Sequence, residues 1–208
     1  MSPRPRLRED EKEEYARRLI EAAFRVIAAT SDSEPAVRAI LREAGLSQQA
    51  FYRCFSSKDD LLDAVLAEGR RLLVEHLTRR MSREPTPEGR IRAWVGGVMQ
   101  QAEAKYAADR TRPFVAGTGR RGAADPTEAT ETERQLGGLL EEVIAAGNAD
   151  GSWACADPAG AALIIHDFVL ASLRRHLING VAPSRSTSQD LADFALRALR
   201  GRPDDRTA

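Results

Sequence analysis

The chain has 208 residues, of which 42% are hydrophobic, and this is enough material for one small and one larger globular domain. Its 31 basic and 31 acidic residues cancel, so the net charge gives no evidence for a nucleic-acid partner, and such evidence must come from where the charges lie. No run of about 18 apolar residues predicts a membrane span, and the first residues lack the apolar core of a signal peptide, so we expect a cytoplasmic protein without membrane contact.

The chain opens with a basic arm and a first helix. The first eight residues are rich in proline and arginine, and we expect either a disordered tail or an arm that lays Arg4, Arg6 and Arg8 along a DNA minor groove. From Glu11 to Thr30 apolar residues recur at helical spacing, which predicts an amphipathic helix. Residues 31–35 form the loop that separates this helix from the next unit.

Residues 36–60 hold the most specific pattern in the chain. Gly45 divides them into two short helices, because glycine accepts a positive φ and lets the chain turn sharply. Ser47 is then expected to cap the second helix by accepting a backbone N–H bond. The first helix turns Arg38 outward and keeps an apolar stripe at i, i+3, i+4 and i+7, made of Val37, Ile40, Leu41 and Ala44.

The second short helix has an apolar face and a polar face. The apolar face, which should pack on the first helix, holds Ala50, Phe51, Cys54 and Phe55. The polar face holds Gln48, Gln49, Tyr52 and Arg53. Glutamine can pair with adenine and arginine with guanine when the N-terminal end of a helix enters the major groove. The pattern therefore predicts a helix that reads double-stranded DNA, with Arg38 and Ser47 as further contacts.

A long helix begins at Lys58. Ser57 is placed as its N-cap, with an acidic residue at the third helical position. Lys58 opposes the helix dipole, which is understandable if a DNA phosphate binds at this helix start, so we predict a phosphate contact from Lys58. Prolines at 85 and 87 end the helix. We place the domain change within it, so the expected domains are residues 1–58 and 59–208.

The run from Val37 to Leu61 resembles the DNA-binding domain of the TetR family of bacterial transcriptional regulators, with its AGVS-type turn, its LYxxF motif, and its SK followed by a leucine. The resemblance implies base or groove contacts from Gln48, Gln49, Tyr52 and Arg53, and backbone contacts from Tyr52 and Lys58. The sequence departs from the family pattern twice. Pro35 stands where many members have a capping threonine, which leaves that role to Ser33 or another neighbour, and Cys54 replaces a frequent histidine.

Glycines mark three places in the middle of the chain. Gly96 and Gly97 interrupt a helix that begins at Thr86–Glu88, and they should permit close approach of a neighbouring helix or a ligand. Residues 117–122 match G-x-G-x-x-G, but no strand precedes them, so we reject a dinucleotide site and expect a loop. Gly147 is expected to end a helix over Thr127–Ala146, with Trp153 in the loop that follows.

The last two helices are expected to form a homodimer interface. Asp157 and Pro158 start a helix that is apolar nearly all round, and a helix without a solvent face must be covered on more than one side. The final helix is expected over Thr187–Arg200. We predict that residues 157–179 and 187–200 pair with their copies in a four-helix interface, and the resemblance implies the same arrangement.

The predicted fold is all-α, with an N-terminal three-helix helix-turn-helix domain followed by a larger helical ligand-binding and dimerisation domain. Large or polarizable side chains on inward faces of the second domain are candidate contacts for a small molecule, although side chains of this kind are more often ordinary core. They are Trp94, Val98, Met99, Phe114, Trp153, His166 and Phe168. No cofactor is expected, and His76, His166 and His176 lack metal-ligand spacing.

The predicted function is a repressor that binds a palindromic operator as a dimer and is released by a small apolar molecule. The alternatives are a helical adaptor and an enzyme. A hydrolase built on His166 and Asp167 is disfavoured, because the sequence has no G-x-S-x-G elbow and adjacent side chains on a helix should point in different directions.

Overall fold

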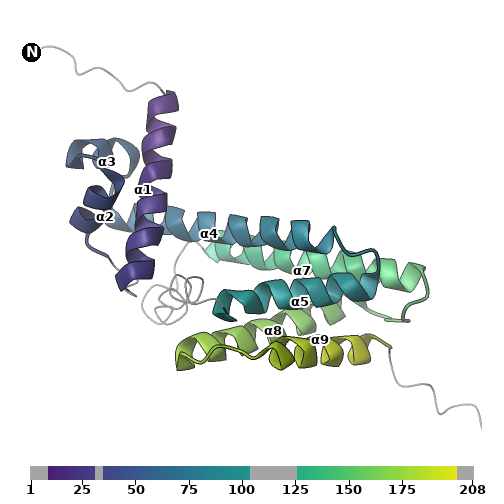
Figure 1. Ribbon diagram of the computed structural model, residues 1–208. Coiled ribbons are helices and arrows are strands. Elements are labelled where there is room, and N and C mark those ends of the chain that lie inside the picture. Colours follow the sequence, from purple (N-terminus) through teal and green to yellow (C-terminus); the bar gives the residue numbers. More distant parts are fainter. Residues whose placement is uncertain (1–8, 31–34, 104–125, 201–208) are drawn as a thin grey trace, which may run out of the picture.

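The computed structural model describes residues 9–30, 35–103 and 126–200, and these form helices without any strand (Figure 1). The all-α prediction is therefore confirmed. The helices of these ranges are α1 (Glu9–Thr30), α2 (Val37–Ala44), α3 (Gln48–Cys54), α4 (Lys58–Met81), α5 (Pro87–Glu103), α7 (Pro126–Ala149), α8 (Pro158–Asn179) and α9 (Arg185–Arg200).

Two hydrophobic cores divide the molecule. We call the part around the first core, residues 9–30 and 35–65, the head; it holds α1, α2, α3 and the start of α4. The rest, residues 66–103 and 126–200, is the body, in which α5, α7, α8 and α9 pack beside the remainder of α4 (Figure 1). Because α4 supplies Leu61 and Val65 to the first core and Leu77 and Met81 to the second, it connects the two mechanically.

The head is a small core enclosed by α1, α2, α3 and the start of α4. Its largest fully buried side chains come from α1, α2, α3 and α4, and are Leu19, Ile27, Ile40, Phe51 and Leu61. Helix α1 starts at Glu9, two residues before the expected position, and its first turn is acidic. Negative charge at a helix N-terminus is favourable, because it complements the helix dipole, and this explains the earlier start.

Gly97 brings α5 close to α4. A Cβ on Gly97 would lie 2.5 Å from Leu77 Cδ2 and 3.3 Å from Arg80 Cδ, and one on Gly96 would lie 3.2 Å from Arg80 Nη2. The close approach predicted for this glycine pair is thus made by a neighbouring helix. The helix continues through both glycines without a break.

The prediction that Gly147 ends its helix is wrong. Helix α7 continues to Ala149, and the left-handed glycine is Gly151, with φ of 80°. The reason is the ring of Trp153, which folds back onto Gly147 so closely that a Cβ there would overlap it. Trp153 Nε1 donates a hydrogen bond to the Ile144 carbonyl at 2.8 Å. Gly147 therefore serves side-chain packing and not chain reversal.

The caps of the last two helices explain their bounds. The Asp157 carboxylate accepts the Gly160 N–H at 3.0 Å, which confirms the predicted start of α8. Helix α9 starts at Arg185 instead of Thr187, because the Ser184 hydroxyl accepts the Thr187 N–H at 3.2 Å and so acts as a cap ahead of it. None of the described helices is long and apolar enough to cross a bilayer.

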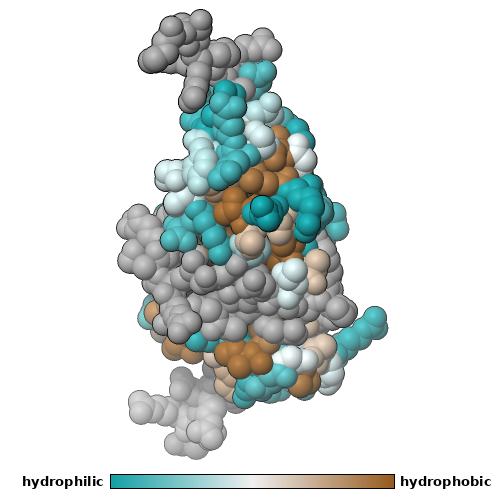
Figure 2. Space-filling model, turned by 90° about the vertical axis from the view of Figure 1, so that its left-hand side faces the viewer, coloured by the Kyte–Doolittle hydropathy of each residue, from teal (hydrophilic) through white to brown (hydrophobic). Residues whose placement is uncertain are grey.

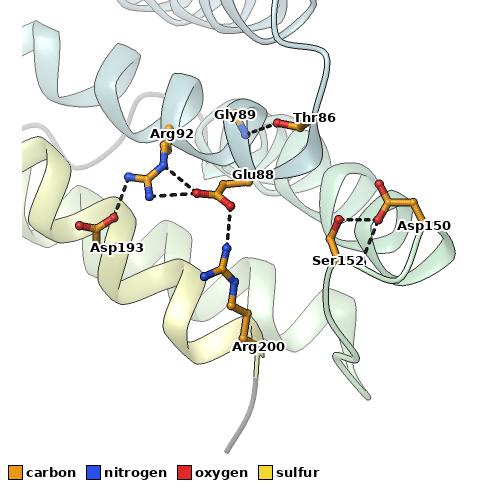
Figure 3. Close-up of polar contacts among 8 residues, drawn as sticks. All are labelled: Thr86, Glu88, Gly89, Arg92, Asp150, Ser152, Asp193 and Arg200. Atoms are coloured by element: carbon orange, nitrogen blue, oxygen red, sulfur yellow. Dashed lines mark hydrogen bonds and ion pairs between the residues drawn. The ribbon is translucent and has the colours of Figure 1, made fainter.

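Polar contacts tie α5 to α9 at the surface of the body (Figure 3). Glu88 accepts from Arg92 within α5 and from Arg200 Nη2 at 2.6 Å, and Arg92 Nη1 lies 2.7 Å from Asp193 Oδ1. All four side chains are substantially exposed, so each pair contributes at most about 1 kcal/mol.

Candidate functional site

The turn between α2 and α3 has the geometry that the sequence predicts. Gly45 lies in the left-handed region, with φ of 63°, and its N–H and that of Leu46 bond to the Arg42 and Leu41 carbonyls. The Ser47 hydroxyl accepts the Ala50 N–H at 3.2 Å and caps α3. A short helix is thereby held at a fixed angle to α2 by backbone geometry.

The two faces of α3 separate as expected. Ala50, Phe51 and Phe55 are buried in the head core, whereas Ser47, Gln48, Gln49 and Arg53 are exposed. Tyr52 is 60% exposed, and its ring meets the edge of Phe51 at a centroid distance of 5.2 Å. Phe51 therefore anchors the helix below and supports the Tyr52 ring above, so the exposed donors and acceptors project from a rigid surface.

The start of α4 carries a reciprocal cap. The Ser57 hydroxyl accepts the Asp60 N–H at 3.0 Å, and Asp60 Oδ2 accepts the Ser56 N–H at 2.8 Å. Lys58, the first residue of α4, is half-buried and lies beside two acidic residues of the first turn. Arg38, exposed in the first turn of α2, also lies at a helix start.

The structure does not test the predictions for the cap of α2 or for the N-terminal arm. The N-cap of α2 is Ala36, which offers no side-chain bond, and Pro35 beside it is buried. Ser33, the expected substitute for the capping threonine, lies outside the described residues, as do Arg4, Arg6 and Arg8.

Arg18 is a residue that the sequence pattern missed. Arg18 is half-buried on α1, and its Nη2 donates to the Ala44 carbonyl at 2.7 Å. Arg25 Nε contacts Glu43 Oε1 at 2.6 Å, so α1 holds the C-terminal end of α2 at two points. These contacts span 26 and 18 residues of sequence, and helical periodicity carries no information about them.

The surface of the head is mixed in character. Figure 2 views the molecule from the side that carries α2 and α3, and shows hydrophilic residues around a smaller hydrophobic area over the head. Cys54, which replaces a frequent family histidine, packs against the head core, and its Sγ lies 3.5 Å from the Lys12 carbonyl. Burial raises the pKa of the Cys54 thiol, which disfavours the reactive thiolate.

Four of the seven ligand candidates come together in the body. Trp94, Val98 and Met99 are fully buried on α5, and His166 of α8 faces Trp94 with ring centroids 6.2 Å apart. Trp153 packs on α7, as described above. Phe114 lies outside the described residues.

Phe168 is placed differently from the prediction. It is 39% exposed on the outer side of α8, and its ring lies 4.9 Å from the Phe194 ring of α9. The prediction that Phe168 faces inward is therefore wrong. The almost uniformly apolar sequence of α8 gave no means of separating its inner face from its outer face.

The geometric argument used against a hydrolase also needs correction. His166 Nδ1 and Asp167 Oδ1 lie 2.9 Å apart, so these adjacent side chains do meet. His166 Nε2, however, has no hydrogen-bond partner among the described residues, so no serine is placed to act as a nucleophile there. The described residues also contain no cluster of three or more metal-binding side chains.

Comparisons with known proteins agree with this geometry. Residues 19–65 match the family model for bacterial regulatory proteins of the tetR family. No curated protein sequence gives a significant match.

Solved structures share the fold over nearly the whole chain. A TetR transcription regulator from Haloarcula marismortui ATCC 43049 is 16% identical, with a TM-score of 0.78, over 91% of this chain and 100% of that one. The fatty acid degradation regulator FadR from Bacillus halodurans is 19% identical, with a TM-score of 0.71, over 90% and 97%. FadR from Bacillus subtilis, in complex with stearoyl-CoA, is 18% identical, with a TM-score of 0.67, over 89% and 97%.

These findings confirm the predicted helix-turn-helix domain followed by a helical domain. They also place the chain among DNA-binding transcriptional regulators and not among enzymes. Residues 19–65 carry the DNA-binding signature of bacterial regulatory proteins of the tetR family, on a fold that solved TetR-family regulators share.

Proposed function

We propose that this regulator is a repressor that binds a palindromic operator as a homodimer and is released by a small, largely apolar molecule bound in its body. The observation that supports DNA recognition most directly is the exposed polar face of α3, held outward by Phe51 and the Ser47 cap. The DNA contacts proposed on this basis are Arg38, Ser47, Gln48, Gln49, Tyr52, Arg53 and Lys58. A regulator of bacterial genes meets its operator in the cytoplasm, where we propose that it acts.

The proposed dimer rests on the outer surface of α8 and α9. Large hydrophobic side chains with exposed fractions between 39% and 70% gather there, namely Leu163, Ile164, Phe168, Ile178 and Phe194. The Phe168–Phe194 ring contact joins the two helices into one apolar surface. Exposed apolar patches of this kind mark association surfaces, and the two-fold pairing of two helices gives a four-helix interface. A monomer in sedimentation at micromolar concentration would contradict this proposal.

Sequence-specific DNA recognition also favours a dimer. One short helix such as α3 reads only a few base pairs, whereas two copies about 34–36 Å apart read a palindrome on one face of the duplex. The operator should therefore be an inverted repeat.

Release by a ligand would work through α4. The helix has one end in the head core and the other in the body core, so a tilt imposed by a molecule in the body changes the position of the head. We accordingly propose residues 1–58 as the DNA-binding domain and 59–208 as the ligand-binding and dimerisation domain. Ligand and operator would then bind antagonistically.

The apolar character of the ligand follows from the residues proposed to surround it. Trp94, Val98 and Met99 are fully buried beside His166, and aromatic, aliphatic and thioether groups favour an apolar molecule. The Bacillus subtilis FadR complex with stearoyl-CoA shows that a regulator of this fold can hold a ligand with a long apolar chain.

The double variant Gln49→Ala/Arg53→Ala tests DNA recognition. Because each base contact contributes about 1–3 kcal/mol, the variant should lose about 30-fold or more in affinity for a duplex selected by the wild-type protein from a random pool. The measurement is a gel shift at fixed salt, with circular dichroism and sedimentation to verify fold and assembly. Arg83→Ala, which removes an exposed arginine just beyond the far end of α4, is the matched control and should bind normally. Equal binding by the double variant and the wild type would refute this assignment of α3.

A further inference from the structure

Two buried nitrogen atoms at the α5–α8 contact have no hydrogen-bond partner within the described ranges. They are Nε1 of Trp94, whose side chain is fully buried, and Nε2 of His166, which is 3% exposed. The two rings are neighbours, with centroids 6.2 Å apart and planes tilted by 51°. A buried polar group without a partner costs about 1–3 kcal/mol, so two such groups side by side are an expensive arrangement for a core that serves only packing.

The hydrogen-bonding role of each nitrogen follows from its chemistry. The indole N–H of Trp94 can only donate. His166 Nδ1 lies 2.9 Å from Oδ1 of Asp167, and a carboxylate only accepts, so Nδ1 carries the proton of the uncharged ring. His166 Nε2 is then an acceptor. The exposed Asp167 thus fixes the tautomer of a histidine that lies inside the body.

A donor and an acceptor on two neighbouring rings match the two hydrogen bonds of a single hydroxyl group. We infer that Trp94 and His166 bind the hydroxyl group of an otherwise apolar effector, whose oxygen accepts from Trp94 Nε1 and whose hydrogen is donated to His166 Nε2. This inference rests on the proposed function, since it specifies the chemical class of the molecule that releases the operator. A carboxylate or an ether lacks the donor that Nε2 requires, and a hydrocarbon lacks both donor and acceptor.

The surrounding residues account for the apolar remainder of such a molecule. Val98 and Met99 follow Trp94 on α5 and are fully buried in the same core. Other buried polar groups occur in the body, at Ser172 and at His76 Nε2. Val98 and Met99 themselves are apolar, so the site would select for one hydroxyl group and accept a range of hydrocarbon shapes.

Paired alcohols and methyl ethers test this inference on the full-length protein. The probes are hexanol, decanol and butylphenol, each with its methyl ether, and dissociation constants come from quenching of tryptophan fluorescence. The ether keeps the accepting oxygen and lacks the donated hydrogen. We expect at least one alcohol to bind about tenfold or more tightly than its ether, because the ether leaves His166 Nε2 unpaired.

Variants at the two rings should separate their roles. His166→Leu removes the acceptor and should bring the alcohol-to-ether affinity ratio close to one, whereas His166→Gln restores an acceptor and should recover part of the preference. Trp94→Phe removes the donor, so both probes should weaken together and the ratio should persist. Met99→Leu, a volume-conserving change beside the site, is the control and should leave the ratio unchanged.

Thermal stability without probe gives an independent readout. His166→Leu removes a buried atom that lacks a partner among the described residues, and it also removes the bond to Asp167, whose exposed carboxylate water can solvate instead. The melting temperature of this variant should therefore equal or exceed that of the wild type. A clear fall in melting temperature, together with no alcohol preference in any of the three probe pairs, would show that these nitrogens are satisfied by buried water and would overturn the inference. A preference that survives His166→Leu would overturn it as well.

The same samples separate this inference from the proposed function. Operator binding is measured for the wild type and each variant without probe and then with the tightest alcohol. If the wild type fails to bind any selected duplex, the proposed function fails. If it binds the duplex but shows no alcohol preference, only the hydroxyl assignment fails.

Discussion

The head and the body use polar side chains in opposite ways. In the head, Gln49 and Arg53 point outward from a helix whose apolar side is buried, so their partner must come from outside the molecule. In the body, Trp94 and His166 point inward, and Trp94 Nε1 and His166 Nε2 lie within the core without a partner among the residues that the structure describes. A surface that reads DNA needs exposed donors and acceptors, whereas a site for a small molecule must enclose them.

The two parts are also held together differently. The head depends on hydrogen bonds at helix ends, such as the Ser47 cap and the Arg18 bond to the Ala44 carbonyl. The body depends on close packing at glycines, where Gly97 meets Leu77 and Gly147 meets Trp153. Single substitutions of these two kinds should therefore affect one part more than the other.

The largest expected effect is in the body, from Gly147→Ala. The added methyl group overlaps the Trp153 ring, and the forced displacement should cost about 1–3 kcal/mol, even though alanine favours a helix over glycine by about 1 kcal/mol. Urea unfolding followed by tryptophan fluorescence measures the loss, and hydrogen exchange should show it concentrated in α7 and α8.

Gly138→Ala on the same helix is the matched control. No described atom lies within 4 Å of a Cβ at Gly138, so this change should be neutral or should stabilise by up to about 1 kcal/mol. Similar behaviour of the two variants would show that Trp153 does not require Gly147.

A smaller effect is expected in the head, from Arg18→Met. The change leaves the Ala44 carbonyl without its charged donor, and the expected loss is about 1–2 kcal/mol of unfolding free energy. Operator affinity should fall as well, because Arg18 holds the end of α2 that precedes the turn into α3. Chemical unfolding and the gel shift measure the two quantities.

The neighbouring Arg17 provides the control for Arg18. It is exposed, and its pairs among the described residues are with Glu14 and Glu21 of the same helix, so Arg17→Met should cost less than about 0.5 kcal/mol and leave operator affinity unchanged. Equal losses from both substitutions would mean that the link between α1 and α2 has no special role.

The smallest effect concerns the section of α4 between the two cores. A hydrogen bond from Arg71 lowers the pKa of Glu68 below its ordinary value of 4.5. The pKa of Glu68 is lower in the folded state than in the unfolded state. The contribution of the Glu68–Arg71 pair to the unfolding free energy is therefore complete above the unfolded-state pKa, and it is lost as the pH falls through the folded-state pKa. Glu68→Gln should reduce the loss of unfolding free energy between neutral and acid pH by less than about 0.5 kcal/mol.

Arg71→Gln should reduce the acid-induced loss of unfolding free energy by the same amount, because it returns Glu68 to its ordinary pKa. Unfolding free energies measured at intervals from neutral pH down to about pH 3 decide the matter. If the unfolding free energy of both variants falls with pH as it does in the wild type, the Glu68–Arg71 pair contributes nothing to the stability of the part of α4 between the two cores.

Local sequence was sufficient to predict the head. The positive φ of Gly45 and the caps at Ser47 and Ser57 were predicted correctly, because each involves residues within a few positions of one another. The outward side of α3 also followed from helical periodicity. Arg18 could not be identified in this way, since its acceptor lies 26 residues away.

The sequence of this protein by itself determined the helices, their order and the exposed polar face of α3, which we propose meets DNA, because backbone hydrogen bonds, caps and apolar spacing are local properties. Only the tertiary structure decided the packing of Trp153 on Gly147, the outward position of Phe168 and the contact between the rings of Trp94 and His166. Each of these depends on which side of one helix faces another, and helices as uniformly apolar as α8 do not encode that choice in their own periodicity.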